Sequence, residues 1–69
     1  MSAPNNSPAI QAEHILEALA EIYPDAAGNT GHLMEYALCD LRHLADRSEL
    51  SFAIADREAH QTYLAEKAR

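Results

Sequence analysis

Apolar residues recur at helical spacing in three separate segments of this chain, and this pattern constrains the fold more than any other feature. In residues 8–23 they follow the i, i+3, i+4, i+7 order, with glutamates on the opposite face. A broad stripe covers 31–47, and a narrower, alanine-rich stripe covers 51–67. No segment alternates apolar and polar residues as a strand would. The sequence therefore predicts an all-α fold, a three-helix bundle running up, down and up.

Turn-forming and capping residues separate the three predicted helices. Ser7 followed by Pro8 is typical of a helix start, after a flexible polar tail at 1–6. Pro24 ends the first helix and opens the loop "PDAAGNTG". Asn29 or Thr30 can cap the second helix. Ser51 is the expected cap of the third.

The chain is short, so its hydrophobic core should be marginal. Its 69 residues indicate a single domain, and a domain of this size buries only about 60% of its unfolded surface. The single cysteine, Cys39, excludes an intrachain disulfide and fits a reducing cytoplasm. Full burial is expected for five residues of the apolar stripes: Leu16, Leu19, Leu38, Leu41 and Leu44.

Acidic residues outnumber basic ones by eleven to five, and they dominate the first part of the chain. Four of them, with no Lys or Arg nearby, form a predicted partner-binding face: Glu13, Glu17, Glu21 and Asp25. Such a face disfavours direct contact with nucleic acid and suits a protein partner with a basic surface. Solubility alone would also explain it.

Some functions find no support in the residues. No basic and apolar leader opens the chain, and no apolar run approaches the roughly 18 residues of a membrane span. No membrane association and a cytoplasmic location are therefore expected. A nucleophile elbow is missing, so no catalytic residue is predicted.

Cys39 and His43 are one helical turn apart and are the candidates for a zinc site, to which Asp46 could add a third ligand. His32 is too far along the helix to join them, and a structural zinc needs four ligands. The glutamates at i, i+4, i+8 could hold Mg²⁺ if Glu35 or Asp40 opposed them. No bound metal or other cofactor is expected.

Apolar or half-polar residues also lie away from the main stripes. On the second helix these are Tyr36 and Cys39, and on the third they are Ile54 and Leu64. Because the chain is short and has no disulfide, a second buried face is expected here. These four residues are predicted to form the interface of a homodimer. A small ligand bound at such an oligomer interface is an alternative.

Two resemblances add to this interpretation. The segments "EHILEALAEI" and "EYALCDLRHLADRSELSF" resemble MazG-type nucleotide pyrophosphohydrolases, helical enzymes that bind Mg²⁺ through E-x-x-E and E-x-x-D helices. The resemblance implies a Mg²⁺-dependent phosphohydrolase using Glu17, Glu35 and Asp40. The chain departs from both motifs: its glutamates are spaced by four, and Leu38 stands where the second motif needs an acid.

The segment "LRHLADRSELSFAIADREAHQTYLAEK" resembles small helical proteins of phages and prophages. The shared pattern is an L-x-F helix start, then A-D-x-x-A and a tyrosine four residues beyond. This resemblance implies a mobile-element origin and no chemistry. The favoured function is a small acidic protein-binding module. In a host cytoplasm it would inhibit or modulate a defence or nucleic-acid-handling protein.

Overall fold

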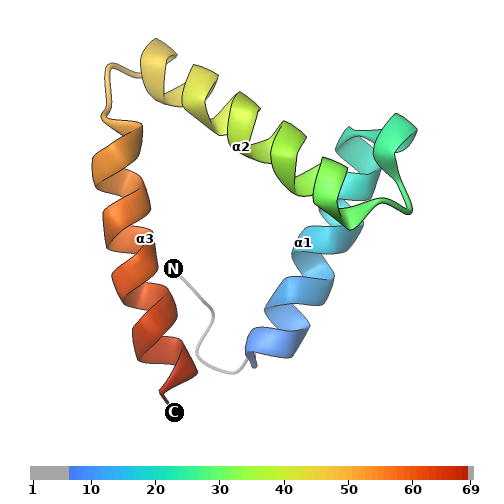
Figure 1. The fold of residues 1–69 in the computed structure, drawn as a ribbon, viewed down its shortest axis with the longest axis horizontal. Helices are drawn as coiled ribbons and strands as arrows, with labels where there is room; N and C mark the ends of the chain where they lie inside the picture. Colours follow the sequence, from blue (N-terminus) through green and yellow to red (C-terminus); the bar gives the residue numbers. More distant parts are fainter. Residues whose placement is uncertain (1–6, 69) are drawn as a thin grey trace. The chain divides into compact units, whose positions relative to one another are not determined.

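The computed structural model describes residues 7–68 as a set of helices (Figure 1). The three α-helices are α1 (Pro8–Ile22), α2 (Thr30–Arg47) and α3 (Phe52–Lys67). A short 3₁₀ helix, η1 (Pro24–Ala26), follows α1. No strand occurs within 7–68. The predicted all-α class with three helices is therefore confirmed, whereas the tail predicted at 1–6 lies outside the described residues.

Each α-helix begins at a side-chain cap of the same kind. In each case a side-chain oxygen accepts a hydrogen bond from the backbone N–H three residues later. The distances are 3.2 Å at Ser7, 3.1 Å at Asn29 and 3.2 Å at Ser51. These bonds satisfy N–H groups that have no partner within the helix. Asn29 is thus the cap of α2, and Thr30 is its first helical residue.

The ends of the first two helices differ in their chemistry. Pro24 closes α1 and opens η1, after the Tyr23 N–H has donated to the Leu19 carbonyl over 2.8 Å. At the end of α2 the Leu50 N–H donates to the Ala45 carbonyl over 2.9 Å, with Glu49 in the left-handed region at φ 58°.

This second arrangement is a Schellman motif, because a further bond of 3.2 Å joins the Glu49 N–H to the Asp46 carbonyl. The left-handed position of that motif is usually glycine, since a Cβ is strained there. The backbone at Glu49, between α2 and α3, is therefore in a conformation that is unfavourable for a residue with a Cβ.

The chain divides into two compact units, and each is described by itself. The N-terminal unit is Met1–Ala37, and the C-terminal unit is Leu38–Arg69. The N-terminal unit has a small core, in which Leu33 is 0% exposed and Ala26 is 4% exposed. Half-buried Leu19 and Tyr23 belong to the same unit.

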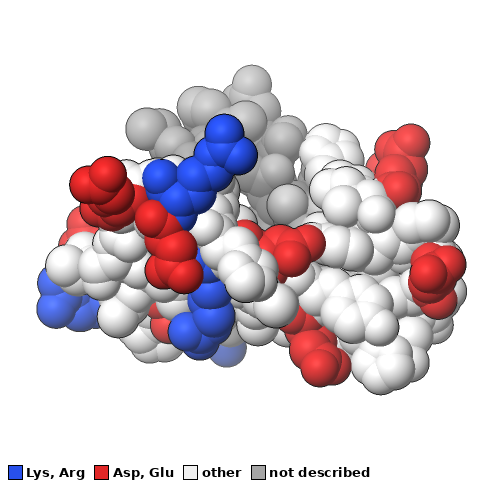
Figure 2. Space-filling view, turned by 90° about the horizontal axis from the view of Figure 1, so that it is seen from above, with Lys and Arg blue, Asp and Glu red and all other residues white. Residues whose placement is uncertain are grey.

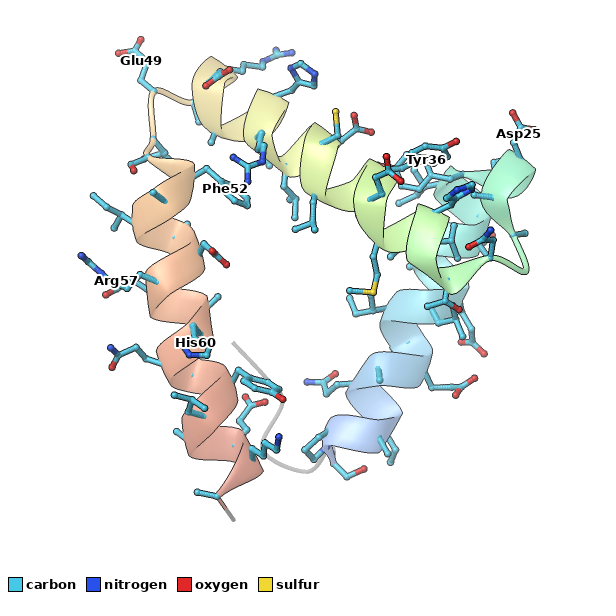
Figure 3. The ribbon with its side chains drawn as sticks, in the orientation of Figure 1. Asp25, Tyr36, Glu49, Phe52, Arg57 and His60 are labelled. Atoms are coloured by element: carbon cyan, nitrogen blue, oxygen red, sulfur yellow. The ribbon has the colours of Figure 1, made fainter. Side chains whose placement is uncertain are left out.

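The C-terminal unit contains no buried residue within 38–68. In this unit α2 and α3 meet near the segment that connects them, where the Arg42 guanidinium of α2 lies 4.4 Å from the centre of the Phe52 ring of α3. Figure 3 shows Phe52 and Arg57 on opposite sides of α3. Phe52 and Ala45 are half-buried, so this unit encloses little apolar surface. The cation–π contact between Arg42 and Phe52 is therefore a main contact between its helices.

The predicted leucine core is wrong for the single chain. Leu16 is 37% exposed, Leu41 is 48% exposed and Leu44 is 55% exposed. Leu38 is 46% exposed, and Leu19 is half-buried. The helical period was predicted correctly, but periodicity reports which face is apolar and does not supply the surface that covers it.

Candidate protein-binding surfaces

Large apolar side chains remain exposed throughout the C-terminal unit. On α2 an exposed leucine stripe is spaced at three residues, and α3 and the connection before it add further apolar side chains. Their exposed fractions range from 46% to 68%. The set comprises Leu38, Leu41, Leu44, Leu50, Ile54, Tyr63 and Leu64. Large exposed apolar patches mark interaction sites in soluble proteins, so these side chains are candidates for such a site.

The predicted dimer-interface residues are all accessible, but they do not belong to one unit. Ile54 is 53% exposed, Leu64 is 50% exposed and the Cys39 thiol is exposed. Tyr36 is 41% exposed and falls in the N-terminal unit. The interface stays a prediction, with Tyr36 engaged in contacts inside its own unit.

Those contacts form an aromatic cluster that the sequence did not predict. The ring centres of Tyr23 and Tyr36 are 5.7 Å apart and tilted by 59°. The Tyr23 hydroxyl lies 3.5 Å from the Tyr36 carbonyl oxygen, to which it donates. The His32 ring stacks on Tyr36 at 6.0 Å. Tyr36 thus contributes to fastening α2 to the segment where α1 ends (Figure 3).

The last turns of α3 carry a second aromatic group. His60 stacks on Tyr63 with ring centres 6.2 Å apart. The Lys67 ammonium donates to the Tyr63 hydroxyl over 3.3 Å and lies 5.5 Å from the ring centre. Tyr63 nevertheless remains 53% exposed, so these contacts along one helix leave much of its surface open.

The four predicted acidic residues are exposed and come from two elements. Glu13, Glu17 and Glu21 lie on α1, and Asp25 lies on η1. Residues 1–37 contain no Lys or Arg. Figure 2 accordingly shows acidic side chains over this unit without basic ones among them. The whole acidic face therefore presents negative charge that no basic residue of its own unit can neutralise.

No metal centre is assembled within residues 7–68. No three His, Cys, Asp or Glu side chains come close enough there to hold an ion. Cys39 and His43 are therefore without a third ligand in the described part of the chain. Glu17, Glu35 and Asp40 likewise do not form the carboxylate cluster that a Mg²⁺-dependent hydrolase needs.

Comparison of the chain with protein-family models, curated proteins and solved structures found no match. Among the described residues, none of the helices has both the length and the apolar character needed to span a bilayer.

Proposed function

We propose that this chain is a small acidic protein-binding module, which acts by covering its apolar helix faces on another polypeptide. The observation that carries the proposal is the exposure pattern: of the residues in 7–68, Ala26 and Leu33 alone are buried, while thirteen large apolar side chains are exposed. Monomeric soluble proteins seldom leave this much apolar surface in water.

The acidic face gives the proposed partner its charge. Glu13, Glu17, Glu21 and Asp25 are exposed in a unit without any basic residue. A basic protein surface would be attracted to them and steered into contact. The same charge repels a phosphate backbone, so the proposed partner is a protein rather than a nucleic acid.

Two further parts of the proposal concern assembly and origin. The module is proposed to act as a homodimer, because identical exposed apolar faces can cover each other. Its resemblance to phage proteins supports a role in a host cytoplasm, as an inhibitor or modulator of a defence or nucleic-acid-handling protein. This origin rests on the segment 41–67 alone.

Charge-neutral variants test the role of the acidic face. In the test variant Glu13, Glu17 and Glu21 become Gln and Asp25 becomes Asn. The control variant neutralises four acids of the C-terminal unit in the same way: Asp46, Glu49, Asp56 and Glu58. Proteins captured from a lysate by each immobilised chain would be quantified by mass spectrometry.

A partner of the acidic face should be retained by the wild type and the control variant, and lost from the test variant. Capture should also weaken as salt rises from about 0.01 M to about 0.1 M, because the Debye length falls from about 30 Å to about 10 Å. Equal capture by the test and control variants would refute the role of the acidic face.

A further inference from the structure

The C-terminal unit has helices but lacks an enclosed core of its own. Between residues 38 and 68 every large aliphatic side chain is exposed, and Phe52 is only half-buried. On α2 the exposed side chains Leu38, Leu41 and Leu44 recur every three residues, and therefore lie along one face of the helix. We call these three residues the leucine face.

We propose that the leucine face is a docking surface for a second copy of this chain. The inference deepens the proposed homodimer by assigning its contact to residues that a single-chain core would have buried. It places the dimer contact in the C-terminal unit and leaves the acidic face of the N-terminal unit free.

Charge favours the C-terminal unit over the N-terminal unit as the contact between two copies. The N-terminal unit has five acids and no base, so two such units repel each other. By sequence, residues 38–69 carry six acids against five bases. Acids and bases alternate closely there, as at Asp46–Arg47 and Asp56–Arg57. Two copies of this nearly neutral unit can therefore approach, with opposite charges available around the apolar centre.

The available area indicates how much of the unit must take part. A stable interface buries roughly 800 Å² on each partner, and the chain exposes 5878 Å² in all. A half-exposed large side chain offers roughly 75–100 Å². The leucine face alone therefore supplies only about a third of the need. The remaining area must come from other parts of the C-terminal unit, such as exposed Leu50 and the side-chain stems of the arginines.

Polar substitution of the leucine face tests the inference. In the test variant Leu41 and Leu44 are both replaced by Gln, which adds no charge. The matched control is His43→Gln, because His43 lies about 200° around α2 from Leu41. The mass of each full-length protein would be measured by sedimentation velocity from about 1 to about 100 μM, a range in which weak dimers form.

The wild type and His43→Gln should sediment as dimers in the upper part of this range. The double leucine variant should have a dissociation constant at least about tenfold higher. A monomeric wild type at about 100 μM, or a double variant that dimerises as well as the control, would overturn the inference.

A dilution series of the wild type gives a test without substitutions. If two copies cover each other, the melting temperature followed by far-UV circular dichroism should rise with protein concentration, because association stabilises the folded state. A melting temperature that does not change with concentration would contradict mutual covering of the helices. Partner capture by the acidic face is measured separately, so a monomer that still captures its partner would refute the dimer contact alone.

Discussion

The two units of this chain differ in how much of their apolar surface they enclose. The N-terminal unit encloses Leu33 and Ala26 and adds an aromatic cluster around Tyr36. The C-terminal unit encloses no residue within 38–68 and keeps its leucines in water. In the N-terminal unit the 3₁₀ helix η1, which begins at Pro24, contributes the buried residue Ala26 to the core. In the C-terminal unit the short connection between α2 and α3 brings Arg42 and Phe52 into a cation–π contact.

Charge divides along the same boundary. All five basic residues lie in 38–69, whereas 1–37 carries five of the eleven acids with no base. The unit that has its own core is therefore the one that repels a copy of itself. The unit that lacks a core has the balanced charge that association requires. The two proposals follow this boundary: the homodimer contact is proposed for the C-terminal unit and the basic partner for the N-terminal unit.

The largest expected effect tests the core of the N-terminal unit. Leu33→Ala should lower the free energy of unfolding by about 2–5 kcal/mol, because Leu33 is fully buried and the change leaves a cavity. Urea unfolding followed by circular dichroism measures this loss. At about 1 μM, where the proposed dimer would be dissociated, Leu50→Ala is the control, because this side chain is 68% exposed and its loss should change stability by less than about 0.5 kcal/mol. Equal effects of the two substitutions would remove the contrast between the units.

Leu41→Ala should have a smaller effect that depends on protein concentration. In the single chain Leu41 is 48% exposed, so at about 1 μM, where the dimer would be dissociated, the cost should be roughly 1 kcal/mol. At about 100 μM the cost should approach 2 kcal/mol, because the dimer covers the rest of the side chain. Melting temperatures at the two concentrations measure the difference. A loss that is independent of concentration would place Leu41 in a contact within one chain.

The helix caps should contribute similarly in the two units. Asn29→Ala and Ser51→Ala each remove one capping bond, of 3.1 Å and 3.2 Å respectively, and each should cost about 1 kcal/mol. Thermal unfolding gives both values. Replacement by Asp at either site should restore most of the loss, since Asp is also a good cap. A much greater loss at Ser51 would show that α3 depends more on its cap than α2 does.

Glu49→Gly should give the smallest change and the only gain in stability. Glycine relieves the left-handed strain at φ 58°, which costs about 1–2 kcal/mol, but loses about 0.5–1 kcal/mol of backbone entropy. A net gain of roughly 0.5–1 kcal/mol is expected. Glu49→Ala removes the same charge and keeps the strain, so it should not stabilise. Urea unfolding distinguishes these variants, and equal stabilisation by both would assign the effect to charge.

Sequence reasoning succeeded where structure is determined by neighbours along the chain. The helices lie within one residue of their predicted bounds, because capping at Ser7 and Ser51 and termination at Pro24 act over three or four residues. Asn29 was one of two candidates, and only its side-chain hydrogen bond distinguished it from Thr30. Glu49 in a left-handed conformation gave no signal, since glutamate has no preference for that region.

Burial could not be predicted in the same way. Leu33 and Leu41 belong to the same stripe of α2, yet one is 0% exposed and the other 48%. The difference depends on which segment folds back over each, and periodicity contains no such information. The Tyr23–Tyr36 contact joins residues thirteen positions apart, beyond the reach of helical spacing. The exposure of Glu13, Glu17 and Glu21 could be predicted, because glutamates four residues apart lie on one side of a helix and form its polar face.

The three capped helix starts also bear on how fast the molecule assembles. Because each cap, and nearly every contact of the chain, joins residues close in sequence, little loop entropy opposes folding of a single chain. Chains with such low contact order fold within microseconds to milliseconds. Encounter between two chains is slower at micromolar concentration, so refolding to the proposed dimer should be second order. Its observed rate should rise in proportion to protein concentration, as expected when collision limits assembly.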